Sequence, residues 1–208
     1  MILFSRNIAI NTEKTVRHIT IILFLILINC KTDKKTEINT QVESEKELVT
    51  ENGIHKTVYE MWNNFTESNH EFKKDKLPDS DFFHDNEKDA NRLAELIINR
   101  KKKASSGLYI WYKEANADLP KIGTKLIVTD FDGKARAIIE TKKVDTIPFN
   151  QISKDYAELD MGTNIEPLEK WKKAHWEFFA NALEQNGQKS TDEMLVVCER
   201  FEKIWPKK

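Results

Sequence analysis

The N-terminal segment of this chain has the pattern of a leader peptide, which limits the part of the chain that can form a folded domain. An almost unbroken apolar run over residues 19–28 follows the cations Arg6, Lys14 and Arg17. Positive residues followed by a short apolar core and a processing site are typical of a secretory signal peptide. The run is shorter than the ~20 apolar residues that a comfortable membrane span needs. We therefore predict that residues 1–29 are a signal peptide and that the remainder supplies the folded domain.

Cys30 stands at the end of this leader. The segment Leu27-Ile28-Asn29-Cys30 resembles the lipobox of bacterial lipoproteins, with Asn29 where Gly, Ala or Ser is usual. The resemblance implies that the Cys30 thiol is lipidated and becomes the new N-terminus, so that lipid chains hold the protein on a membrane of the cell envelope. Lys31 gives no inner-membrane retention signal, which favours the outer membrane and leaves the leaflet open. The alternative is an uncleaved N-terminal anchor with an incidental cysteine.

Composition limits the rest of the chain to a tether and one domain with an ordinary apolar core. Residues 30–54 are polar and contain no aromatic residue, which predicts a disordered tether. The domain is expected over residues 55–208. Cys198 is the sole other cysteine, so lipidation of Cys30 leaves no disulfide partner and an inert buried thiol is expected. The formal net charge of -1 carries no global signature of nucleic-acid binding.

Apolar periodicity predicts helices around a small sheet. Helices are expected from His55 through Phe65, from Asp85 or Asn86 to the cations 100–103, and from Pro167 to Asn186. Strands are expected over residues 107–112, 124–130, 135–142 and 194–205, with 144–149 as an edge or a bend. This order of elements predicts an α+β fold with a small sheet or barrel flanked by helices. The sequence contains neither a Gly-rich phosphate loop nor a metal-ligand cluster, so we expect no cofactor and no metal.

A series of short motifs runs in order along the domain. The motifs are Phe82–Asp85, Asn99–Ser106, Trp111-Tyr112, Pro120–Lys134, Ile138–Asn150, Trp171–Phe179 and Val196–Phe201. From about Met61 to the C-terminus the chain is similar to the ASCH domain family. The resemblance implies a PUA-like β-barrel and a pocket for RNA, a nucleoside or a nucleotide-like small molecule.

The same resemblance implies an activity. Some small members hydrolyse the acetyl amide of N4-acetylcytidine, and others are described as RNA-cleaving or RNA-binding. In the amidohydrolases a Gly-x-Lys-x-x-Thr turn and an acidic residue after the third strand do the work. These positions fall on Lys102, Ser105 and Asp160, with Glu158 as the neighbouring acid.

Amide hydrolysis requires a nucleophile, a group that takes its proton and a donor for the leaving amine. Ser105 is expected to be the nucleophile. Lys102 would hold or accept its proton if burial favours the neutral amine, and Asp160 would orient Lys102 or relay a proton. His175 is the alternative base, but it lies on an apolar helical stripe, which predicts a core histidine.

The chain departs from the amidohydrolase motif at several positions. Arg100 replaces the glycine of the motif, Lys103 replaces the threonine that follows the lysine, and Gly107 replaces the final arginine. A cation for a phosphate or a carbonyl is therefore missing. The acid is Asp160 instead of Glu, and a misplacement of about 1 Å can cost ~10²-fold in rate. Hydrolysis is one hypothesis among several.

Two other function classes stay open. A non-catalytic module would bind single-stranded RNA or a nucleotide with Arg100 and Lys103, together with stacking on Trp111 and Tyr112. Glu158 completes this expected binding set. Cations 100–103 are equally explained as a solvated helix end, and one of the two aromatics is expected in the core. The third class is an envelope lipoprotein that uses the fold for another ligand. The oligomeric state stays open.

Overall fold

The computed structural model describes residues 53–207. The predicted signal peptide, Cys30 and nearly all of the predicted tether lie outside the described residues. Within the described part of the chain, no helix is both long and apolar enough to cross a membrane.

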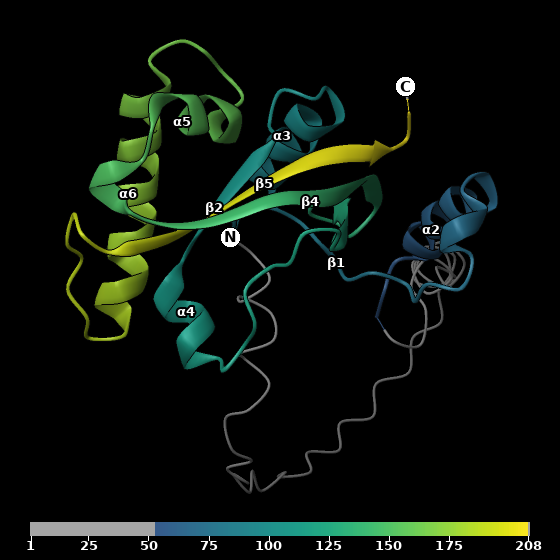
Figure 1. The fold of residues 1–208 in the computed structure, drawn as a ribbon, viewed down its shortest axis with the longest axis horizontal. Helices are drawn as coiled ribbons and strands as arrows, with labels where there is room; N and C mark the ends of the chain where they lie inside the picture. The colour runs from purple at the N-terminus through teal and green to yellow at the C-terminus, as the bar shows by residue number, and fades with distance from the viewer. Residues whose placement is uncertain (1–52, 208) are drawn as a thin grey trace, which may run out of the picture.

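A five-stranded mixed sheet forms the centre of the domain (Figure 1). Its strands are β1 (Ser80–Asp81), β2 (Ala104–Leu108), β3 (Lys125–Thr129), β4 (Ala135–Pro148) and β5 (Leu195–Trp205). The spatial order is β1-β3-β4-β5-β2, with β1 parallel to β3 and the other neighbours antiparallel. The long β4–β5 ladder runs from Ile138 opposite Trp205 to Pro148 opposite Leu195. The predicted α+β class is confirmed.

Within residues 53–207, five helices flank the sheet. They are α2 (Lys56–Ser68), α3 (Glu87–Ile98), α4 (Tyr109–Glu114), α5 (Lys154–Met161) and α6 (Pro167–Gln185), with 3-10 turns η2 (His70–Phe72) and η3 (Phe149–Gln151). The side chains of His55 and Asn86 cap α2 and α3 by accepting backbone N–H groups, and Pro167 opens α6. The three predicted helices are confirmed, whereas α4 and α5 were not predicted.

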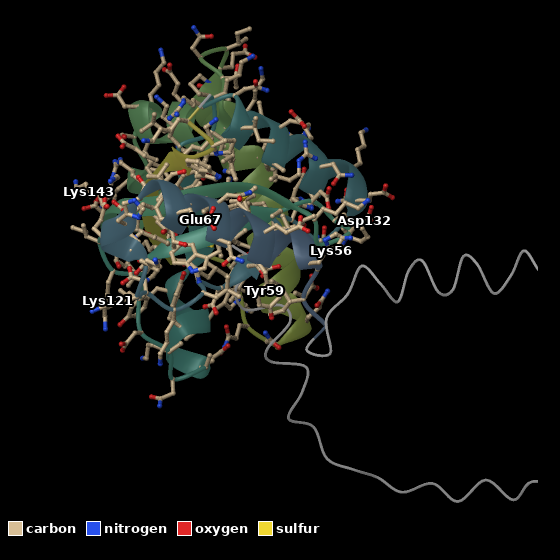
Figure 2. All side chains as sticks on the ribbon, turned by 90° about the vertical axis from the view of Figure 1, so that its right-hand side faces the viewer. Lys56, Tyr59, Glu67, Lys121, Asp132 and Lys143 are labelled. Atoms are coloured by element: carbon tan, nitrogen blue, oxygen red, sulfur yellow. The ribbon has the colours of Figure 1, made fainter. Side chains whose placement is uncertain are left out.

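Helices α2 and α3 cover opposite faces of the β3–β4 hairpin. Ile127 and Ile138 contribute to the cluster that includes α2, whereas Val128 and Ile139 contribute to the cluster that includes α3. Successive residues of a strand point to opposite faces, so each strand supplies both cores. Figure 2, turned so that α2 faces the viewer, shows exposed charged side chains such as Lys121 on one side of α2 and Asp132 on the other.

A third core joins α5 and α6 to strands β2 and β5. Its largest fully buried side chains are Trp171, Tyr156 and Phe179. Cys198 on β5 belongs to the same cluster, and burial raises the pKa of its thiol to about 12. Such a thiol is a poor nucleophile at neutral pH, in agreement with the inert buried cysteine that was predicted.

The predicted strand over residues 107–112 is only partly right, because its second half is a helix. Residues 109–112 lie in α4 instead of extending β2, because β2 pairs its last residue with Val196, one residue from the end of β5. Without a longer partner strand, the β-propensity of Trp111 and Tyr112 does not decide their conformation. Residues 144–148 continue β4 and pair with β5 on one side, beyond the part of β4 that β3 covers, so the edge alternative is observed and the bend is not.

Gly162 ends α5 beside the turn that carries Lys102. It has a φ of 66°, and an added Cβ would lie 3.3 Å from the backbone of Lys101 and Lys102. Gly187 has a φ of 70°, but no atom lies within 4 Å of its added Cβ. We expect Gly187→Ala to lose about 1 kcal/mol of unfolding free energy through backbone strain. Gly162→Ala should lose at least about 1 kcal/mol more, because the steric conflict is added.

Urea denaturation of both variants measures this difference. Equal losses would contradict a close approach between α5 and the Lys102 turn.

Candidate functional site

A cavity of about 220 Å³ lies where α3, β2, α5 and α6 meet. Phe83 and Phe178 give it aromatic walls, and the polar groups of Lys102, Asp160 and His175 reach its lining. Aromatic walls with a few convergent polar groups are typical of a small-molecule site.

An ion pair between Lys102 and Asp160 is buried beside this cavity. The two residues are 6% and 2% exposed. Lys102 Nζ donates to Asp160 Oδ1 and, at 2.8 Å, to the Asp160 backbone carbonyl. The Lys102 ammonium also lies 5.6 Å from the centre of the Phe83 ring. Burial of two charges is tolerated only when each has close and well-oriented partners.

The local backbone brings the two residues together. After α3 ends, the N–H groups of Lys101 and Lys102 both donate to the Leu96 carbonyl, which forms a tight turn. The N–H of Lys103 then donates to the Leu159 carbonyl of α5 at 2.8 Å. This contact joins the turn to the helix that carries Asp160.

The second carboxylate oxygen of Asp160, Oδ2, also has close polar contacts. Ser106 Oγ donates to Oδ2 at 2.6 Å, Trp171 Nε1 donates at 2.8 Å, and His175 Nε2 lies 3.3 Å away. Burial alone would raise the pKa of Asp160, but the charge of Lys102 and the hydrogen bond of His175 outweigh it. The pKa is therefore held well below its usual value, and Asp160 is a weak base.

The hydroxyl of Ser106, the residue after the predicted nucleophile Ser105, contacts the carboxylate. Both serines line the cavity. The Tyr156 hydroxyl donates to the Ser105 carbonyl at 2.6 Å and lies 3.0 Å from Ser106 Oγ. Burial and then the charge of Asp160 raise the pKa of Tyr156 well above its ordinary value, so the phenol stays neutral.

The structure brings together the three predicted catalytic residues Lys102, Ser105 and Asp160 at one cavity. The five predicted binding residues Arg100, Lys103, Trp111, Tyr112 and Glu158 are not among the residues that line it.

Other contacts account for several of these five. Arg100 donates to the backbone carbonyls of Lys203 and Lys207, which secures the C-terminal strand. The Trp111 ring packs edge-on against Phe178 and Phe179. Lys103 and Glu158 are exposed. Burial raises the pKa of Tyr112 well above its ordinary value.

Sequence reasoning missed Ser106, Tyr156 and Trp171 as members of the site. It assigned His175 to the core, and the structure shows a buried histidine that also lines the cavity. Trp171 and His175 are four residues apart and therefore share one face of α6. That spacing was visible, but a shared apolar stripe is equally compatible with a plain core. Across residues 53–207, His, Cys, Asp and Glu form no group of three or more that could hold a metal ion.

The comparison with known families agrees with the fold and the predicted resemblance. The model of the ASCH domain family matches residues 79–205. The chain belongs to the ASCH domain family. No curated protein matches the chain.

Two solved structures support this assignment. The crystal structure of an ASCH domain from Lactobacillus crispatus is 30% identical, with a TM-score of 0.67, and the match covers 73% of this chain and 96% of that one. A protein from Enterococcus faecalis is 32% identical, with a TM-score of 0.65, and the match covers 72% of this chain and 88% of that one.

The buried pair makes a prediction about stability. Lys102→Met should lower the free energy of unfolding by about 3–5 kcal/mol at pH 7, because it leaves the Asp160 carboxylate buried without its cation. Lys103→Met removes an exposed neighbouring cation, and its free energy of unfolding should stay within about 0.5 kcal/mol of the wild-type value.

The pH dependence separates charge loss from packing loss. The lowered pKa of Asp160 stabilises the fold above the unfolded value of about 3.9, and this stability is lost as the pH falls below it. Denaturation curves should therefore show a difference between the wild type and Lys102→Met that shrinks below about pH 4. A difference that stays constant from pH 7 to pH 3 would mean that the ion pair is not its cause.

Proposed function

We propose that this ASCH domain binds a nucleoside-like small molecule in the cavity between α3 and α6. The observation that carries the proposal is the buried Lys102–Asp160 pair beside a cavity walled by Phe83 and Phe178. Nucleobases bind proteins through stacking on aromatic rings and hydrogen bonds along their edges. The site offers both kinds of contact.

Size and charge favour a single base over a length of RNA. The volume of about 220 Å³ lies below the ~300–1,000 Å³ of sites for drug-sized ligands. An RNA groove requires cations that follow the backbone. Here Lys102 is buried in an ion pair and Arg100 is engaged by two backbone carbonyls, so residues 100–103 do not form a continuous exposed cationic surface.

Hydrolysis of an acylated nucleobase amide, such as that of N4-acetylcytidine, is the second candidate. Its support is the convergence of Lys102, Ser105, Ser106 and Asp160 at one cavity. Either serine would attack the acyl carbon while Lys102 donates to the acyl oxygen. The amide C–N bond would then break, the serine proton would leave with the nucleobase amine, and water would release the acyl group from the serine as an acid. Because Lys102 is held in an ion pair with Asp160, and Asp160 is itself a weak base, neither member of the pair is an evident acceptor for the serine proton. Binding therefore ranks first.

Calorimetry with cytidine and N4-acetylcytidine tests the binding proposal. The full chain should bind at least one of them, and Phe178→Ala should weaken the affinity by about 5–150-fold, the loss expected for one stacking contact. Phe131→Ala is the matched control, because Phe131 is a partly exposed aromatic that does not line the cavity. Absence of binding to either nucleoside, or equal effects of both variants, would refute the proposal.

The same mixtures decide the second candidate. Chromatography of the N4-acetylcytidine sample should show cytidine release that disappears in Lys102→Met. Binding without release would leave the domain a non-catalytic module.

We also propose that a lipid at Cys30 anchors the domain in the bacterial cell envelope, with the outer membrane preferred. Its support is the sequence of the leader, residues 1–29, and the polar tether that follows. The ligand would then be a nucleoside or a related molecule met outside the cytoplasm.

Labelling of growing cells with radioactive palmitate tests the anchor. The wild-type protein should take up label and Cys30→Ser should not, because its thiol is lost. Cys198→Ser removes the buried second cysteine and should retain the label. A protein that stays unlabelled, or a Cys30→Ser variant that is labelled normally, would contradict the anchor.

A further inference from the structure

We propose that His175 is held beside the cavity as an imidazolium, with a proton on each ring nitrogen, and that it is a positioning residue for Asp160. The proposal goes beyond the binding of a nucleoside, because it concerns the charge of the unliganded site.

The two ring nitrogens of His175 both face acceptors. Nδ1 lies 2.9 Å from the backbone carbonyl oxygen of Trp171, which can only accept a hydrogen bond. Nε2 lies 3.3 Å from Asp160 Oδ2, and an ionised carboxylate also can only accept. A neutral imidazole carries one N–H and would direct a lone pair at one of these oxygens. The imidazolium satisfies both contacts.

The ring environment also favours a cation. The imidazole of His175 stacks on the indole of Trp171, with 4.3 Å between the ring centres and 17° between the planes. A cation over an indole face is attracted by the electrons of the ring. The same imidazole also makes an edge contact with the ring of Phe179, with 5.5 Å between the ring centres.

Lys102 is a like charge on the same carboxylate and by itself disfavours a second cation there, but the two residues face different oxygens. Lys102 engages the other carboxylate oxygen, so the two cations share Asp160 from different sides. Tyr156, which comes from the same helix as Asp160, stays neutral at physiological pH.

Across the cavity, two more titratable groups are paired locally. Arg92 is 2.8 Å from Asp89, and His84 is 2.6 Å from Asp85. The charges of the first pair cancel within α3.

A positive His175 gives Asp160 a second charged partner on the side away from Lys102. The carboxylate is then fixed by Lys102 at Oδ1 and by Ser106, Trp171 and His175 around Oδ2. Removal of the imidazolium proton would free Oδ2 on that side and loosen the orientation of the Lys102 ammonium that the carboxylate holds.

The charge also bears on the ligand, and this consequence rests on the proposed function. The lining pairs Lys102–Asp160 and Arg92–Asp89 each sum to zero. The positive charge of the His175 imidazolium is then not balanced by either of these two pairs. The cavity should therefore prefer a ligand that presents a carbonyl or anionic oxygen to one that presents a cationic group.

Long-range ¹H–¹⁵N NMR of histidine side chains in the full chain tests the charge directly. At pH 7.5 an ordinary histidine is mostly neutral, because its pKa is about 6.5. We expect His175 to show two protonated nitrogens at this pH.

His55 provides an internal comparison with a different hydrogen-bond pattern. Its Nδ1 accepts the backbone N–H of Thr57, which requires a lone pair on that nitrogen. The signal of His175 is assigned by its loss in His175→Gln and, independently of any variant, by through-space contacts with the Trp171 indole.

A neutral His175 at pH 7.5, in either tautomer, would overturn the proposal. The ligand consequence is tested separately: the affinity for a bound nucleoside should fall as the His175 signal becomes neutral, and this pH dependence should be absent in His175→Gln. If no nucleoside binds, the proposed function fails while the NMR result still decides the charge of His175.

Discussion

The buried contact between Lys102 and Asp160 is the interaction on which the rest of the site depends. A carboxylate removed from water is unfavourable unless donors replace its hydration. Here the donors are the Lys102 ammonium, the Ser106 hydroxyl and the Trp171 indole N–H. The turn after α3, strand β2 and helix α6 must therefore all meet α5 at one point. The close approach of Gly162 to that turn follows from the same requirement.

This convergence explains why the cavity combines apolar walls with a charged group at its edge. The aromatic side chains of Phe83 and Phe178 come from the segment before α3 and from α6, the elements that also approach the ion pair. Electrostatic interactions beside such apolar walls are stronger than in water, because the local dielectric constant is lower. The arrangement supports recognition of a small ligand with polar edges, and it sets the charged groups in place before the ligand arrives.

Much of the fold could be predicted because its signals are local. The apolar stripes of α2, α3 and α6 repeat at helical spacing, and Asn86 was one of two predicted caps for α3. Strands β3 and β5 contain residues that favour strands, although the alternation along β5 is imperfect. Helix α4 could not be predicted this way, because the length of β2 is set by its partner β5 and the aromatic residues of α4 favour strands. The pairing of β4 with β5 likewise joins residues that are far apart in sequence.

The site could be predicted only in part. Lys102 and Asp160 are 58 residues apart, so their pairing came from a family resemblance and not from a local pattern. Motif spacing pointed to Ser105, which lines the cavity, but it did not reveal that the hydroxyl of the next residue, Ser106, donates to the carboxylate. His175 and Trp171 looked like core residues because both are apolar-stripe positions of α6. They are indeed buried, but they also contact Asp160, and the sequence pattern does not distinguish the two roles.

A crystal structure of the full chain grown with saturating cytidine tests most directly whether the Lys102–Asp160 pair marks the ligand site. The account predicts the base in the cavity, in contact with Phe83 and Phe178, with a polar edge toward the buried pair. An empty cavity, or cytidine bound at another surface while the cavity stays unchanged, would contradict it.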